Sequence, residues 1–185
     1  MLNREIPVLV SSNVILKRFQ KENISDEYLS WLNDQKVVKY SVQRHISHDR
    51  STAEAYLDWM AQRGGIVFAI YDKSQNRHVG NISLDFDPPN LTCDMALMIG
   101  NRSFWGKGIA KEAWIAVRDF AFEQLGYRKI NAGTLSVNTP MLKLAVNTGM
   151  VPDGVQKDQY IWEGQLVDRV FFAFFNKSFQ QKSEE

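Results

Sequence analysis

The chain of 185 residues contains a single cysteine, Cys93, so it cannot form a disulfide within itself. This excludes the disulfide frameworks of small secreted proteins. No apolar run approaches the ~20 residues that a membrane-spanning helix needs, and residues 1–5 lack the pattern of a signal peptide. We therefore expect a cytoplasmic protein with no membrane partner.

An excess of charge of either sign is also missing, because 22 Lys and Arg stand against 21 Asp and Glu. A protein that mainly binds nucleic acid carries a clear basic excess, so no nucleic-acid partner is expected. Histidine is scarce, at three residues. His45 and His48 lie three apart, but no cysteine is near them and no regular helix is expected there, so no metal site is predicted.

The remaining composition is that of a globular protein, with 44% hydrophobic and 23% charged residues. Its length indicates one domain, which we place over residues 1–176. Residues 177–185 are polar and predict a C-terminal tail.

Hydrophobic periodicity predicts an alternation of strands and helices. Helices are expected after a cap at Ser25, from Asp49 or Ser51 to Arg63, over 108–125, and from Pro140 to about 147. The first strand is expected at a sheet edge. The predicted strands are 14–19, 66–71, 78–86, 92–99, 129–137, 155–162 and 165–175.

The stretch from Ile99 to Ala113 passes from an apolar strand through a Gly-rich turn into the longest helix. Backbone N–H groups at a helix N-terminus have no internal partner and bind phosphate well. Gly106 and Gly108 leave the backbone open to such a ligand. A kinase-type phosphate loop is excluded by its spacing and by Gly108 at the hydroxyl position, and a dinucleotide-binding fingerprint by Lys111.

This stretch resembles the acyl-CoA pyrophosphate loop of the GNAT superfamily of N-acetyltransferases. The family pattern is Gln or Arg, two residues, Gly, one residue, then Gly or Ala, and Ser103, Gly106 and Gly108 occupy these positions. Ser103 departs from the usual first residue. The extension Phe-Trp-Gly-Lys-Gly-x-Ala-x-Glu-Ala is typical of the branch with ribosomal-protein N-terminal acetyltransferases and sugar-modifying relatives.

The resemblance implies an α/β (α+β) three-layer fold: a central, mixed, mostly antiparallel sheet of about seven strands with about four helices, splayed at the cofactor site. It also implies acetyl-CoA as cofactor, with Met98 and Ile99 on pantetheine. Asn138 matches a family asparagine at the cofactor, although a turn residue before Pro140 is the alternative reading. The residues implied to bind the pyrophosphate are Phe104, Trp105, Gly106, Lys107, Gly108, Ile109 and Ala110.

An acceptor ammonium must lose a proton before it can attack a thioester, and a carboxylate can remove that proton. Asp94 lies where the family often has a glutamate, so it is the candidate base; the alternatives are that it only faces solvent, or that Asp85 or Asp87 acts instead. The family's tyrosine and serine acids are absent, because Ala145 and Met141 occupy those positions. Water, Ser136 or the ammonium proton are the remaining proton donors.

The acceptor itself is open. We favour direct acetyl transfer in a ternary complex to a small amine, such as a nucleotide-linked amino sugar; the alternatives are a protein N-terminus and a catalytically silent acyl-CoA-binding regulator. The apolar strand at 170–175 is either central in the sheet or part of a homodimer contact. The expected acceptor-binding residues are Arg44, His45, Asp85, Tyr160 and Trp162.

Overall fold

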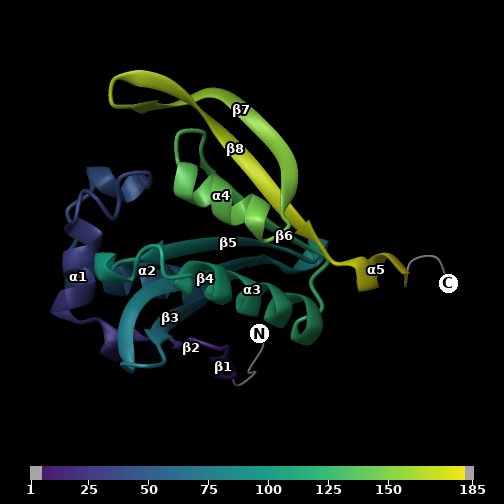
Figure 1. Cartoon of the computed structure of the whole chain (residues 1–185), viewed down its shortest axis with the longest axis horizontal. Helices are drawn as coiled ribbons and strands as arrows, with labels where there is room; N and C mark the ends of the chain where they lie inside the picture. Colours follow the sequence, from purple (N-terminus) through teal and green to yellow (C-terminus); the bar gives the residue numbers. More distant parts are fainter. Residues whose placement is uncertain (1–5, 182–185) are drawn as a thin grey trace. The chain divides into compact units, whose positions relative to one another are not determined.

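The computed structural model describes residues 6–181, whose elements are labelled in Figure 1. These residues form two compact units. Unit 1 consists of Met1–Phe86 and Met95–Val117, and unit 2 of Asp87–Asp94 and Arg118–Glu185. That residues 1–176 act as one domain stays a prediction.

Hydrogen bonds join eight strands of the described chain in the order β1-β2-β3-β4-β5-β6-β8-β7. The sheet is mostly antiparallel, and β5 and β6 form a parallel pair. This confirms the predicted mixed sheet, with one strand more than expected. The strands are β1 Leu9–Val10, β2 Val14–Arg18, β3 Ile66–Asp72, β4 Arg77–Asp87, β5 Thr92–Ile99, β6 Lys129–Leu135, β7 Val151–Trp162 and β8 Gln165–Phe175.

Five α-helices occur in the described residues, one more than expected. The additional helix, α5, lies within the predicted tail, of which residues 182–185 fall outside the described part. The helices are α1 Asp26–Asn33, α2 Arg50–Gln62, α3 Ile109–Asp119, α4 Thr139–Asn147 and α5 Lys177–Gln181. No helix in the described residues is long and apolar enough to cross a membrane.

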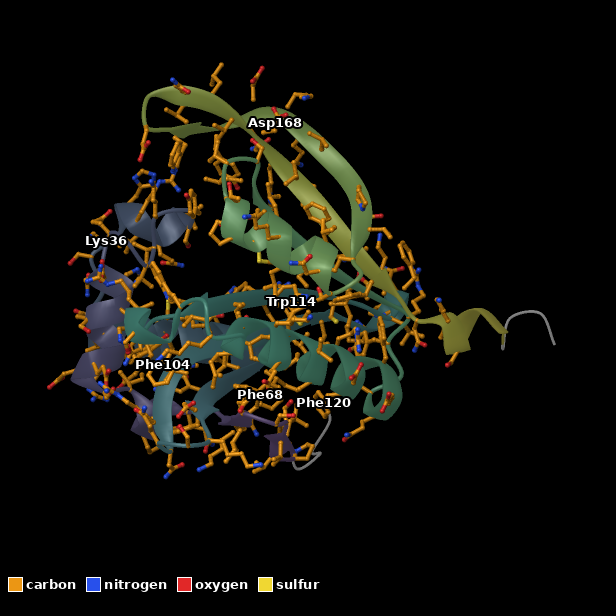
Figure 2. The ribbon with its side chains drawn as sticks, in the orientation of Figure 1. Lys36, Phe68, Phe104, Trp114, Phe120 and Asp168 are labelled. Carbon is orange, nitrogen blue, oxygen red and sulfur yellow. The ribbon has the colours of Figure 1, made fainter. Side chains whose placement is uncertain are left out.

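Local signals set the ends of the helices in unit 1. Ser25 caps α1 by accepting a hydrogen bond from the backbone of Tyr28 at 3.1 Å. Asp49 and Thr52 form a reciprocal capping box at the start of α2. Both helices then turn apolar side chains toward β3, whose residues Ile66 to Ile70 are all buried. Phe68 and Trp114 are fully buried in this unit (Figure 2).

The first predicted strand is not at the sheet edge, so that expectation is wrong. β2 corresponds to it and pairs with β3 on one side and with β1 on the other. A strand of two residues such as β1 is too short to show a period of two, so the sequence pattern gave no sign of it.

Unit 2 contains the long hairpin of β7 and β8 (Figure 1). β8 lies between β6 and β7, so its apolar run belongs to a central strand. The helix predicted over 108–125 is α-helical only to Asp119 and continues as a π-helical turn, Phe120–Gln124. The backbone N–H of Leu125 accordingly donates to the carbonyl of Phe120, five residues earlier.

Candidate active site

The Gly-rich loop of unit 1 joins the end of β5 to the start of α3. A single 3₁₀ turn, Arg102–Phe104, comes first, and the two glycines follow. Gly106 and Gly108 have φ angles of +74° and +82°, which an L side chain rarely adopts. A Cβ added at either glycine would meet no atom within 4 Å. The loop therefore leaves open space beside backbone N–H groups at a helix N-terminus, which fits a phosphate.

The residues before the glycines are fixed by the rest of unit 1. The indole Nε1 of Trp105 donates to the carbonyl of Ile99 at 2.8 Å, so this side chain closes the turn although it is 46% exposed. The Phe104 ring is buried, and the Lys107 ammonium lies 4.8 Å from its centroid. Arg102 lies within 3.2 Å of the Asp34 carboxylate, so its charge is already partly compensated.

The other predicted cofactor residues lie on the flanks of this loop. Met98 and Ile99 are half-buried at the end of β5. Ile109 is buried and Ala110 is half-buried in the first turn of α3, so only their backbone N–H groups are candidates for phosphate binding.

Asp94 lies on β5 in unit 2, at the last residue pair of the parallel ladder. Its partner across the ladder is Asn131 of β6. Residues opposite each other in a ladder share one face of the sheet, so an amide stands beside the candidate base. The Oδ1 atom of Asn131 is buried and accepts no hydrogen bond within the described residues. A buried carbonyl without a donor is unusual in a folded protein.

Two of the predicted acceptor residues, Arg44 and His45, lie on the short 3₁₀ helix Val42–His45. The Arg44 Nη1 atom donates to the Ser41 carbonyl at 2.8 Å, and His45 is exposed. Asp85 lies on β4, where Arg63 donates to both of its carboxylate oxygens at 2.9–3.1 Å. The charge of Asp85 is thus paired with Arg63, and a paired carboxylate accepts a proton less readily.

The remaining predicted residues lie in unit 2. Tyr160 and Trp162 are half-buried near the end of β7 and alternate with exposed Ile161. Asn138 is the N-cap of α4: its Nδ2 donates to Thr134 Oγ1 at 2.8 Å, and its Oδ1 accepts from the backbone of Met141. Within the described residues, no group of three or more His, Cys, Asp or Glu side chains is placed to hold a metal ion.

Three polar residues near these sites carried no signal in the sequence. Asn131 is one of them. Glu27 and Asn101 are the others, and they meet at the start of the loop although they are 74 residues apart. Only the tertiary structure brings Asn131 opposite Asp94 and Glu27 to Asn101.

The comparisons with known proteins agree with this geometry. Residues 13–151 match the family model described as an acetyltransferase (GNAT) domain. A curated relative, "Uncharacterized N-acetyltransferase p20" of Bacillus licheniformis, is 24% identical over 175 residues, covering 92% of this chain and 97% of its own.

Two solved structures share the fold. Spermidine N-acetyltransferase from Vibrio cholerae, in complex with CoA and spermine, superposes with a TM-score of 0.79 at 16% identity, over 92% of this chain and 99% of its own. Ribosomal-protein-S5-alanine acetyltransferase from Vibrio fischeri superposes with a TM-score of 0.78 at 15% identity, over 94% of this chain and 99% of its own. With the family model spanning most of the sequence, this chain is a member of the GNAT acetyltransferase family and is an acyltransferase.

Proposed function

We propose that the protein transfers the acetyl group of acetyl-CoA to the primary amine of a small molecule. The loop at Gly106 and Gly108 carries this proposal, because a Cβ added at either glycine would meet no atom within 4 Å just before the start of α3. Lys107 and Lys111 add positive charge at the same place, which suits a diphosphate. Membership of the acetyltransferase family supports the same conclusion.

In this proposal, residues Phe104 to Ala110 hold the pyrophosphate, and Met98 and Ile99 hold the pantetheine. Asn138 adds a contact through the N–H of its amide that Thr134 does not use. Bound acetyl-CoA supplies an acetyl group that the thioester has already activated.

Asp94 then accepts a proton from the acceptor ammonium, which leaves a neutral amine with a free electron pair. Asn131 lies opposite Asp94 on the same face of the sheet, and we propose that its Oδ1 atom turns to accept a second N–H of the same ammonium. The amide would thereby orient the amine as the carboxylate deprotonates it.

Neither position where the family places its proton donor carries an acidic group, since Ala145 has only a methyl side chain and Met141 a thioether. We propose that the leaving thiolate takes its proton from water, from Ser136 or from the ammonium proton as it returns. A thiolate is a stable enough leaving group for this to suffice.

For the acceptor we favour a nucleotide-linked amino sugar, because half-buried Arg44 and exposed His45 lie together on one short 3₁₀ turn that suits a sugar-phosphate. The likeness in fold to a spermidine N-acetyltransferase adds polyamines, and the likeness to the ribosomal-protein-S5-alanine acetyltransferase keeps a protein N-terminus as the second candidate.

Release of free thiol from acetyl-CoA distinguishes these acceptors. The purified protein is assayed against nucleotide-linked amino sugars, polyamines and short peptides with free N-termini, each pool in turn. We expect release with a small-amine pool. Release with peptides alone would replace the proposal by N-terminal acetylation, and acetyl-CoA binding without release in any pool would favour a silent acyl-CoA-binding regulator.

A further inference from the structure

One face of α1 contacts three successive residues at the start of the Gly-rich loop. Trp31 packs on Gly100, Glu27 bonds to Asn101, and Asp34, the C-cap of the helix, pairs with Arg102. Glu27, Trp31 and Asp34 are spaced by four and three residues, the spacing at which side chains share a helix face. We propose that Glu27 is a positioning residue for the CoA-binding loop, an inference that rests on the proposed function.

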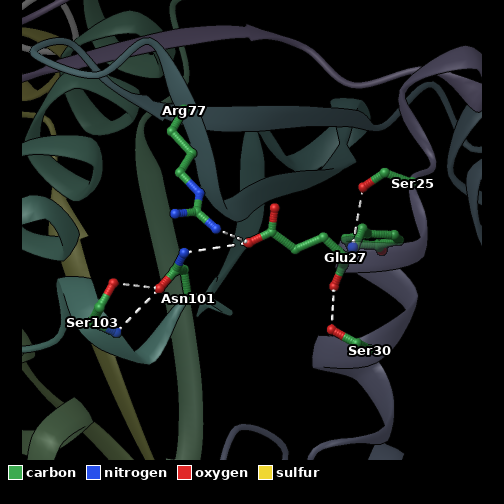
Figure 3. A network of polar contacts seen from close by, with 7 residues as sticks. Ser25, Glu27, Ser30, Arg77, Asn101 and Ser103 are labelled. Carbon is green, nitrogen blue, oxygen red and sulfur yellow. Dashed lines mark hydrogen bonds and ion pairs between the residues drawn. The ribbon is translucent and has the colours of Figure 1, made fainter.

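The bonds around Asn101 show how Glu27 acts (Figure 3). The Glu27 Oε1 atom accepts from Asn101 Nδ2 at 3.3 Å and from Arg77 Nη2 at 2.8 Å. Because Asn101 uses its Nδ2 for Glu27, its Oδ1 faces the loop. There it accepts from the backbone N–H of Ser103 at 3.1 Å and from the Ser103 hydroxyl at 2.6 Å. Glu27 thus selects which end of the amide caps the turn.

Ser103, which this cap holds, lies three residues before Gly106. Glycines have wide conformational freedom, so backbone N–H groups beside them hold a fixed direction only if the flanking residues are anchored. The backbone N–H of Asn101 also donates to the Val79 carbonyl at 3.0 Å. Through Asn101 and Ser103, Glu27 therefore limits the motion of the chain that enters the loop.

Ser103 is the position at which the sequence departs from the Gln or Arg of the family pattern. Its hydroxyl and backbone N–H both bond to Asn101, so this chain builds the entry to the loop with a short polar network. A long cationic or amide side chain is not used there.

Because Glu27 is negatively charged, the direction in which its removal changes the CoA affinity tests the proposal. A carboxylate repels the phosphates of CoA, so if Glu27 acted only through its field, its removal would tighten CoA binding. If Glu27 positions the loop, its removal weakens CoA binding. The Asp26→Ala variant is the matched control, because it removes one carboxylate from the same first turn and, within residues 6–181, Asp26 makes no bond to the loop.

The experiment measures the dissociation constant for CoA by calorimetry and the KM for acetyl-CoA. We expect Glu27→Ala to raise both by about fivefold to tenfold, the change that corresponds to one lost capping bond. At saturating acetyl-CoA, kcat should change less than about twofold, because the reacting groups are untouched. Asp26→Ala should leave the CoA affinity unchanged or slightly tighter.

A second pair of variants tests the amide itself. Asn101→Asp places a carboxylate against Glu27 and should weaken CoA binding as much as Glu27→Ala does. Adding Glu27→Gln should restore the affinity for CoA. The glutamine amide can donate to one oxygen of the new aspartate, and the other oxygen of that aspartate still caps Ser103. Unchanged or tighter CoA binding in Glu27→Ala, or no restoration in the double variant, would overturn the proposal.

Hydrogen exchange in the ligand-free protein separates this inference from the proposed function. We expect the amides of residues 103–108 to exchange faster in Glu27→Ala than in Asp26→Ala, whether or not CoA is the ligand. Equal exchange in the two variants would overturn the role of Glu27. Wild-type protein that binds no CoA would overturn the proposed function, and exchange would still decide the positioning role.

Discussion

The indole ring of Trp31 lies directly against the backbone of Gly100, so closely that a Cβ added to the glycine would overlap the ring. Trp31 is 5% exposed on α1, and Gly100 follows the last residue of β5. The contact brings a helix to the point where the strand turns into the loop.

We expect Gly100→Ala to lower the free energy of unfolding by about 1–3 kcal/mol, because the methyl group overpacks a buried site. Urea denaturation measures this change. Gly64→Ala is the control: its Cβ would meet no atom within 4 Å, and only the backbone strain of φ +74° is added, about 1 kcal/mol. A Gly100→Ala protein no less stable than this control would contradict the close packing.

The phosphate role of the loop predicts that Gly106→Glu weakens acetyl-CoA binding by more than about 100-fold. The new carboxylate would occupy the open space beside the loop and repel the phosphates. Gly149→Glu, at the end of α4, is a matched control, because Gly149 also has a positive φ and open space around it. Calorimetric titration with acetyl-CoA compares the two, and equal affinities would show that the ligand lies elsewhere.

The proposed base predicts that Asp94→Asn lowers kcat by about 100-fold or more and leaves acetyl-CoA affinity unchanged. The amide keeps the shape of the carboxylate but cannot accept the proton. Asp87→Asn tests the alternative base at the end of β4, where Asp87 accepts from Asn90 Nδ2 at 2.8 Å. Steady-state thiol release should fall only in the first variant; a fall only in Asp87→Asn would move the base to that strand.

Asn138 has a structural duty that can be separated from its proposed cofactor contact. Asn138→Ala should lower the free energy of unfolding by about 1 kcal/mol, because α4 loses its cap. Asn138→Asp keeps a capping oxygen, so its stability should stay near wild type while acetyl-CoA affinity falls about tenfold with the lost N–H. Wild-type acetyl-CoA affinity in the Asn138→Asp variant would show that Asn138 acts only as the cap of α4.

His78 predicts a pH dependence of stability. The ring is surrounded by Phe19, Tyr28, Trp31 and Tyr71, and burial lowers its pKa more than Asn81, Gly80 and the charge of Glu27 raise it. The unfolded chain therefore binds this proton at a higher pH than the native protein does. The contribution of neutral His78 to stability is fully present above the unfolded pKa of about 6.5 and is lost as the pH falls below that value.

Urea denaturation at several pH values from about 7.5 to 5 measures this loss. We expect His78→Gln to reduce the slope in that window, since the group that titrates is gone. A wild-type slope in His78→Gln would show that other groups control the pH dependence.

The sequence by itself determined the local structure of this protein. Periods of two and 3.6 residues predicted the long strands and the first four helices, because these periods follow directly from which side chains are buried. The glycines at 106 and 108 predicted the open turn before α3, since a positive φ is a local property of the backbone. Elements too short to repeat a period, such as β1 and α5, were not predicted, because a single period gives no recognisable pattern.

Only the tertiary structure decided which distant residues meet. Asp94 stands opposite Asn131 because β5 and β6 pair in one particular parallel register. Glu27 reaches Asn101 because α1 packs beside the end of β5, and no pattern in either segment refers to the other. Local periodicity records whether a side chain is buried, but its partner depends on strand order and register, which the whole chain settles together.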